Sequence, residues 1–268
     1  MTQTQKKNVS GVFKNIYIYI VFLFLYIPIF YVIIFSFNTS KMNIVFENFT
    51  LQWYGTFFKN RPLMEALANT LVIGILSTAI STVIGTIGAI GLSKYKFKGR
   101  EIIDKLLYIP IVIPEVVLGI ALLSIYSVFS IPLGIISITL SHITFSIPFV
   151  VITVRARLAG FDKFLEEAAM DLGANRVVTF RRVTLPLIMP GVLSGAMLAF
   201  SLSIDDVVIS FFTSGPGSTT LPLKIFSMVK TGVTPEVNAL STVIMFITII
   251  IISINTSFQV KKLKANKA

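Results

Sequence analysis

The sequence contains no cysteine and only one histidine, His142. The absence of cysteine excludes a disulfide scaffold, a thiolate metal site and a cysteine nucleophile. A single histidine leaves little room for a histidine-based metal centre or a serine-type triad, because each needs histidine in a fixed role. No Gly-x-x-x-x-Gly-Lys-Ser/Thr loop occurs either, so the chain has no recognisable phosphate cradle. We therefore expect no catalytic residue, no metal and no cofactor.

Charged residues are also scarce. They make up 13% of the 268 positions, whereas an average soluble domain has about 25%. Hydrophobic residues account for 54%, including 23 phenylalanines. A soluble protein of this size needs more polar surface to cover its core, so the composition indicates an integral membrane protein and disfavours a soluble enzyme.

Six long apolar segments can each cross the membrane, since about 20 residues at 1.5 Å per residue span roughly 30 Å of hydrocarbon. The predicted fold is all-α with six transmembrane helices, at residues 16–37, 66–92, 106–129, 131–154, 187–212 and 239–258. Only three acidic residues interrupt these segments. Glu115 lies in the third, and Asp205 and Asp206 lie in the fifth.

The basic residues orient the predicted spans. Lysine and arginine number 23 against 12 acidic residues, and eighteen of them flank the spans on one face, with five on the other. The positive-inside rule then places both termini in the cytoplasm. The domain organisation is a tail at 1–15, a six-span domain at 16–258 and a basic tail at 259–268. The positive charges suit membrane lipid, and no nucleic-acid partner is expected.

The longest cytoplasmic loop, residues 155–186, is predicted to form a helix–turn–helix elbow. Asp162 can cap its first helix, and Gly173 stands where a left-handed residue would end that helix. A second short helix is expected to begin at Asn175 and to end near Pro186, because proline disrupts a helix interior.

One edge of the first elbow helix is apolar. Phe164, Ala168 and Leu172 recur at four-residue spacing, with Leu165 and Ala169 beside them. This pattern fits an amphipathic elbow on the lipid surface. It also fits a docking helix for a soluble partner, where alanine side chains permit close approach. The pattern alone leaves both interpretations open.

The order of residues in this loop resembles the EAA loop of ABC-importer permeases. Glu167-Ala168-Ala169 is followed after three residues by Gly173, and after nine more by Val183-Thr184-Leu185-Pro186. The family more often has isoleucine at the position of Val183. The resemblance implies a type I ABC-importer permease fold, with a cytoplasmic coupling helix between spans four and five that inserts into a groove of the ATP-binding subunit. The implied docking residues are Glu167, Ala168, Ala169, Asp171, Leu172 and Gly173.

Further segments resemble the C-type permease subunit of spermidine/putrescine importers. They are residues 49–54, 141–145, 203–208, 221–229 and 232–242. The resemblance implies half of a polyamine pathway across the inner membrane. It also implies two copies of an ATP-binding cassette subunit, a second homologous permease chain and an extracytoplasmic polyamine-binding protein. The chain itself would be no enzyme, because the ATP-binding subunit hydrolyses ATP. The alternatives are an ABC permease for another small solute and a non-transporting membrane scaffold.

The acidic residues within spans are the candidates for the substrate path. Each carboxylate would cost about 2.5–3.5 kcal/mol or more facing lipid at mid-bilayer, so Glu115, Asp205 and Asp206 are expected to face protein or water. Counted along straight helices, Asp205 and Asp206 lie near the outer mouth and Glu115 lies deeper. The alternative roles are ion pairing with a basic residue and helix capping. His142 is expected to be a buried, hydrogen-bonded residue rather than a proton relay.

Overall fold

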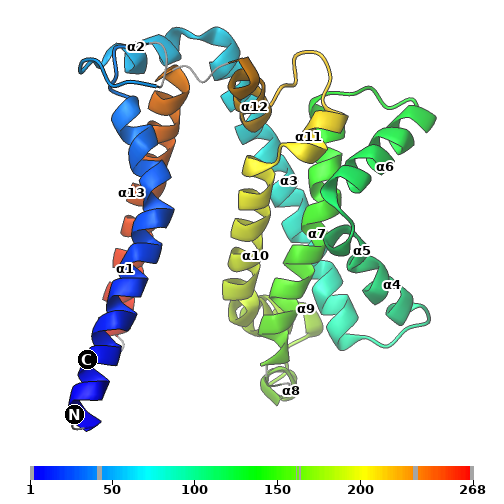
Figure 1. Ribbon diagram of the computed structural model, residues 1–268. Coiled ribbons are helices and arrows are strands. Elements are labelled where there is room, and N and C mark those ends of the chain that lie inside the picture. Colours follow the sequence, from blue (N-terminus) through cyan, green and yellow to red (C-terminus); the bar gives the residue numbers. More distant parts are fainter. Residues whose placement is uncertain (1–2, 41–43, 161, 163, 232–234, 266–268) are drawn as a thin grey trace. The chain divides into compact units, whose positions relative to one another are not determined.

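The structure is a computed structural model that describes residues 3–40, 44–160, 162, 164–231 and 235–265 (Figure 1). The described residues are helices joined by turns, with a single isolated bridge between Asn38 and Phe49. The chain divides into two compact units. One comprises residues 1–64 and 227–268, and the other comprises residues 65–226.

Three helices make up most of the first unit, namely α1 (Gln3–Phe35), α2 (Gln52–Lys59) and α13 (Pro235–Ala265). Helices α1 and α13 run alongside each other, and the start of α1 lies at the same end of this unit as the end of α13 (Figure 1). Trp53 of α2 is buried and donates a 2.6 Å hydrogen bond from its indole nitrogen to the Asn38 carbonyl. The loop after α1 is thereby fixed to α2.

Three long helices form the core of the second unit, namely α3 (Arg61–Lys94), α7 (Ile135–Ala159) and α10 (Leu185–Asp205). Val150 of α7 meets a glycine on each side. A Cβ added at Gly85 of α3 would lie 2.7 Å from Val150 Cβ, and one at Gly195 of α10 would lie 3.3 Å from Val150 Cα. Small residues let helix backbones approach closely in the membrane, so these glycines bring α3 and α10 against α7.

The prediction of one continuous helix over 106–129 is wrong. This segment contains α4 (Arg100–Leu107), α5 (Ile109–Val112) and α6 (Glu115–Val128), and the chain bends by 112° between α5 and α6. Ile113 and Pro114 are both extended, with ψ of 135°. Proline lacks an amide hydrogen and holds the preceding residue in extended backbone, so Pro114 ends one helix and starts another.

The prediction of one continuous helix over 187–212 is also wrong. Helix α10 ends at Asp205, Asp206 is extended with ψ of 125°, and the short helix α11 (Val208–Thr213) follows. The Asp206 carboxylate accepts hydrogen bonds from the backbone amides of Ile209 at 3.2 Å and Ser210 at 2.7 Å. Asp206 therefore caps α11 instead of continuing α10. After α11, α12 (Leu221–Thr231) completes the described elements of the chain.

The described helices supply four candidate membrane spans, or five if the bent pair counts as one. Four helices are long and apolar enough to cross, at Asn15–Phe35, Arg61–Lys94, Ile135–Ala159 and Arg176–Asp205, and the bent pair Arg100–Val112 and Glu115–Val128 makes a fifth if counted as one span. The predicted sixth span, 239–258, lies within the single helix α13, and the apolar helix found among the described residues there is Pro235–Ile247. The six-span count remains a prediction. The domain boundaries 1–15, 16–258 and 259–268 also remain predictions. Residues 1–2 and 266–268 lie outside the described ranges, as do residues 232–234 of the segment 232–242.

Candidate functional site

The two helix breaks border the same cavity, which has a volume of about 410 Å³. Glu115, Asp205 and Asp206 all line it. A count of residues along straight helices predicts a separate depth for Glu115. The breaks at Pro114 and Asp206 bring the three carboxyl groups to one cavity instead. The other lining residues are apolar: Pro110, Ile111, Ile113, Leu118, Phe145, Phe149, Leu202, Val207, Val208 and Ile209.

The electrostatic character of this cavity is negative. None of the described residues that line it is basic. Helix α10 ends there, and the C-terminal end of a helix carries partial negative charge and carbonyl groups without intrahelical partners. The positive N-terminal end of α6 is offset by its own first residue, Glu115. The cavity is therefore suited to a cation.

The two adjacent aspartates have different surroundings. The Asp206 side chain is only 5% exposed and lies 3.3 Å from His142 Nε2, measured to its Oδ2 atom. The Asp205 side chain is exposed, and within the described chain no other residue donates a hydrogen bond to it. Glu115 is likewise exposed and unpaired among the described residues. Asp205 and Glu115 are thus the carboxylates free to contact a ligand.

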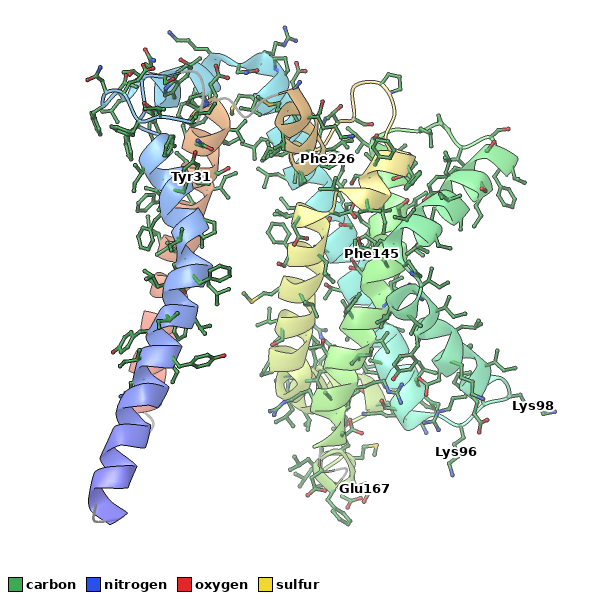
Figure 2. All side chains as sticks on the ribbon, viewed as in Figure 1. Tyr31, Lys96, Lys98, Phe145, Glu167 and Phe226 are labelled. Carbon is green, nitrogen blue, oxygen red and sulfur yellow. The ribbon has the colours of Figure 1, made fainter. Side chains whose placement is uncertain are left out.

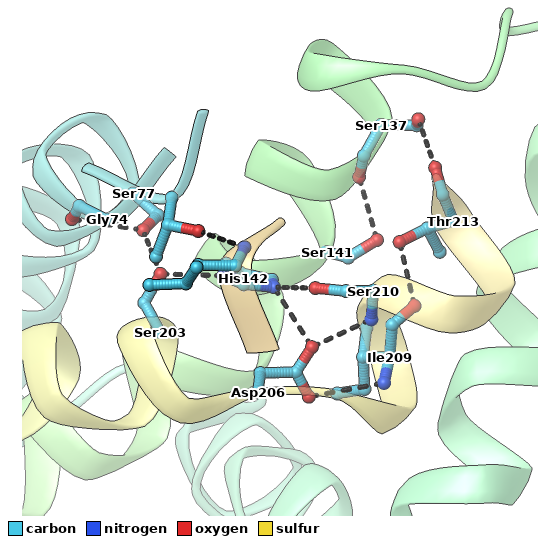
Figure 3. Close-up of polar contacts among 12 residues, drawn as sticks. Gly74, Ser77, Ser137, Ser141, His142, Ser203, Asp206, Ile209, Ser210 and Thr213 are labelled. Atoms are coloured by element: carbon cyan, nitrogen blue, oxygen red, sulfur yellow. Dashed lines mark hydrogen bonds and ion pairs between the residues drawn. The ribbon is translucent and has the colours of Figure 1, made fainter. Parts of the chain in front are cut away.

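A buried polar network surrounds His142 (Figure 3). Its Nδ1 lies 2.6 Å from the Ser203 hydroxyl and its Nε2 lies 3.2 Å from the Ser210 hydroxyl. The Ser203 hydroxyl in turn lies 3.1 Å from that of Ser77 in α3. The His142 side chain is 1% exposed, so the prediction of a buried, hydrogen-bonded histidine is confirmed.

The predicted elbow contains α8 (Phe164–Asp171), α9 (Arg176–Thr179) and the π-helical turn η1 (Phe180–Thr184). Its predicted local signals are confirmed. Asp162 accepts a 3.0 Å hydrogen bond from the Phe164 amide at the start of α8. Gly173 follows α8 with a φ of +88°. Asn175 caps the second helix through a 2.9 Å hydrogen bond from the Val178 amide.

The prediction that the second elbow helix ends near Pro186 is wrong. Helix α9, η1 and α10 follow one another directly, and Arg176–Asp205 is one continuous helix. Pro186 has no amide hydrogen for the normal α-helical bond. The π-helical turn just before it, where the Leu185 amide bonds the Phe180 carbonyl, accommodates the irregular hydrogen bonding. The second part of the elbow, α9 and η1, and Asp205 therefore belong to a single helix.

The predicted docking residues lie mostly on the surface. Glu167 is at the tip of the elbow (Figure 2), and its neighbours Ala168, Asp171 and Gly173 are also exposed, while Ala169 is half-buried. Leu172 is 90% exposed. Ala168, Ala169 and Leu172 border an open hollow, together with Leu165, Arg182, Val183, Pro186 and Leu187. The hollow is mostly apolar and lies open at the surface.

A contact that the sequence did not reveal fixes α8 to the rest of the unit. The Glu166 carboxylate pairs with Lys94 of α3 and accepts a hydrogen bond from the Thr184 hydroxyl of η1. Burial would raise the pKa of Glu166, but the hydrogen bonds from Lys94 and Thr184, together with the lysine charge, outweigh burial and hold this pKa below its ordinary value of 4.5. Lys94 precedes Glu166 by 72 positions, so no local pattern could indicate the pair.

We expect Glu166→Gln to reduce the stability of the folded chain at neutral pH by at most about 1 kcal/mol, the usual scale for a partly exposed ion pair. A carboxylate with a lowered pKa stabilises the folded state above its ordinary pKa, and the effect disappears as the pH falls through the lowered value. Thermal unfolding in detergent should show a constant difference between variant and wild type from pH 7 to 4.5, shrinking below it. Glu167→Gln is the matched control, and an equal loss in both variants would contradict the assignment.

A model of the family described as "Binding-protein-dependent transport system inner membrane component" matches residues 81–261. The chain belongs to this family. Permeases of ABC importers work with ATP-binding subunits, a partner permease and an extracytoplasmic binding protein.

Relatives with known roles extend over almost the whole chain. The spermidine/putrescine transport system permease protein PotC of Escherichia coli (strain K12) is 42% identical over 246 residues, covering 92% of this chain and 93% of PotC. The putrescine transport system permease protein PotI of the same strain is 39% identical over 231 residues, covering 84% and 82%. The chain is similar to these proteins over most of their length.

A solved structure shows the same fold. A chain of a bacterial ABC transporter involved in the import of the acidic polysaccharide alginate superposes with a TM-score of 0.74, covering 96% of this chain and 98% of that one at 15% identity. At that identity the likeness concerns the fold alone. The predicted ABC-importer permease fold is confirmed.

Proposed function

We propose that this chain is one permease subunit of an ATP-driven importer for polyamines, and that the cavity at the two helix breaks receives their ammonium groups. The observation that carries the proposal is the meeting of Glu115, Asp205 and Asp206 in one cavity that no described basic residue lines. The similarity to PotC and PotI supports spermidine or putrescine as the substrate.

The chemistry of the cavity matches that of a polyamine. Exposed carboxylates at Asp205 and Glu115 can each accept hydrogen bonds from an ammonium group, and such charge-assisted bonds are stronger than neutral ones. The methylene segments between amines need apolar contact, which Leu118 and Leu202 offer. Phe145 and Phe149 add aromatic faces that attract cations.

The elbow couples this cavity to ATP. The docking residues Glu167, Ala168, Ala169, Asp171, Leu172 and Gly173 bind a groove of the ATP-binding subunit. Closure of two such subunits on ATP displaces α8, and the continuous helix Arg176–Asp205 carries the displacement to the cavity. The chain catalyses no reaction of its own, because the ATP-binding subunits hydrolyse ATP.

The complete importer in this proposal has two ATP-binding subunits, this chain, a second homologous permease chain and an extracytoplasmic polyamine-binding protein. The chain lies in the inner membrane with both termini in the cytoplasm. The excess of basic residues next to the termini supports this orientation. The start of α1 and the end of α13 lie at the same end of their unit, which also agrees with this orientation.

The proposal is tested by uptake of labelled spermidine and putrescine. Cells without their own polyamine import should carry the full transporter set and be challenged with sugars, phosphate and amino acids. Saturable uptake that only polyamines inhibit is the expected result. Inhibition by an uncharged solute or an anion would favour a permease for another solute, and an assembled complex without any polyamine uptake would overturn the proposal.

A further inference from the structure

We infer that His142 is a positioning residue that commits Asp206 to capping α11 and thereby leaves Asp205 as the aspartate that meets the substrate. This inference rests on the proposed function for its consequence in transport. Its structural part concerns only how the two aspartates are held. In the sequence they are adjacent and equivalent, whereas in the structure one is buried and bonded and the other is exposed.

The hydrogen bonds of Asp206 use both of its carboxylate oxygens. Oδ1 accepts from the Ile209 amide, and Oδ2 accepts from the Ser210 amide and lies 3.3 Å from His142 Nε2. All three groups lie on the side of the carboxylate facing α11 and α7 (Figure 3). An ammonium group from the cavity would have to compete with two backbone amides and the adjacent imidazole at Asp206, but with no other residue's donor at Asp205.

The arrangement of His142 fits one consistent set of donors. If Nε2–H donates to Asp206, Nδ1 is left as an acceptor for the Ser203 hydroxyl at 2.6 Å. The Ser203 hydroxyl, which then donates to Nδ1, lies 3.1 Å from the Ser77 hydroxyl. Ser77 is in α3, Ser203 in α10 and His142 in α7. The histidine ring is thus held by three helices of the core, and through it the core fixes the carboxylate at the α10–α11 break.

Loss of the histidine should release Asp206. With leucine at position 142, Oδ2 loses one of its donors, and a buried carboxylate with unmet hydrogen-bonding capacity is costly. The Asp206 side chain is then expected to turn toward the cavity, where water can hydrate it. The carboxylate would stand beside Asp205 and change how the cavity holds two ammonium groups. Glutamine at position 142 keeps a donor and an acceptor on one side chain and should hold Asp206 in place.

The test is chemical labelling of carboxyl groups in the purified complex, with a water-soluble carbodiimide and glycine ethyl ester read out by mass spectrometry. In the wild type we expect modification of Asp205 and Glu115 but protection of Asp206. In His142→Leu, Asp206 should become modified, and in His142→Gln it should stay protected. Ser141→Ala is the matched control, since Ser141 is a buried α7 residue bonded to Tyr126 and not to Asp206, and Asp206 should remain protected there.

The consequence for transport is measured on the same variants. His142→Leu should raise the KM for spermidine by about tenfold, which corresponds to about 1.4 kcal/mol, with assembly retained, while His142→Gln should stay close to wild type. A purely structural role would lower the amount of complex and leave KM unchanged. Labelling of Asp206 in the wild type, or its protection in His142→Leu, would overturn the inference. Because labelling needs no substrate, a wild type that labels as expected but transports no polyamine would contradict only the proposed function.

Discussion

Replacement of Leu172 by lysine is expected to abolish copurification of this chain with its ATP-binding subunit and, with it, ATP-driven uptake. Leu172 is 90% exposed, so the substitution removes no packing within the chain. In the complex, burial of a leucine side chain contributes about 1.5–3 kcal/mol, which corresponds to about a 10- to 150-fold change in affinity. A lysine in the same groove adds the cost of burying its charge.

The measurement is affinity purification of the membrane chain followed by quantification of the bound ATP-binding subunit. Leu172→Met, which keeps the side chain apolar and of similar volume, is the matched control and should copurify normally. The amount of the chain in the membrane should be equal in all samples. Normal copurification of Leu172→Lys would mean that α8 is not the docking element, and would favour an elbow that lies on lipid.

Replacement of Asp205 by asparagine is expected to reduce polyamine uptake by about 10- to 150-fold. A hydrogen bond to a charged group contributes about 1.5–3 kcal/mol, and the amide of asparagine keeps the size of the side chain without its charge. Helix α10 should remain intact, since no other residue of the described chain donates a hydrogen bond to the Asp205 carboxylate. Uptake of labelled spermidine, normalised to assembled complex, measures the effect.

Asp205→Glu is the control for this substitution because it retains the carboxylate and moves it by one methylene. It should transport within a few-fold of the wild type. Equal uptake by Asp205→Asn and the wild type would contradict the role of this carboxylate, whereas equal losses in the asparagine and glutamate variants would indicate that shape matters and charge does not.

The sequence predicted the local features of the fold well. Apolar length was sufficient to place helices at 16–37, 66–92 and 131–154, since a helix in lipid satisfies its own backbone groups. The caps at Asp162 and Asn175 and the left-handed Gly173 could be recognised because each depends on a residue type and its immediate neighbours.

The two helix breaks were not predicted. One has a local signal that does not specify its geometry, and the other involves residues distant in the sequence. Pro114 is a local signal for a disturbed helix, but a proline alone does not specify a bend of 112°. The break at Asp206 has no proline or glycine beside it. There the Asp206 carboxylate contacts His142, 64 positions earlier in the chain, and accepts hydrogen bonds from two amides of α11, so this break belongs to the tertiary structure.

The same distinction applies to the candidate site. Glu115, Asp205 and Asp206 could be selected from the sequence because a charge within an apolar span is costly unless protein or water surrounds it. Their common position in one cavity could not be predicted, since it requires the correct bends in two helices. Nor could the sequence separate Asp205 from Asp206, because the separation arises from partners on α7 and α11.

The central claim, that polyamines occupy the cavity at the helix breaks, can be tested most directly with single cysteines, because the chain has none of its own. Leu202 lines the cavity, whereas Ser127 is exposed outside it. In the assembled importer we predict that spermidine at about ten times its KM slows the reaction of Leu202→Cys with a cationic methanethiosulfonate reagent by about tenfold, and leaves Ser127→Cys unchanged. Equal rates at position 202 with and without saturating spermidine, in a complex that still transports, would contradict the account.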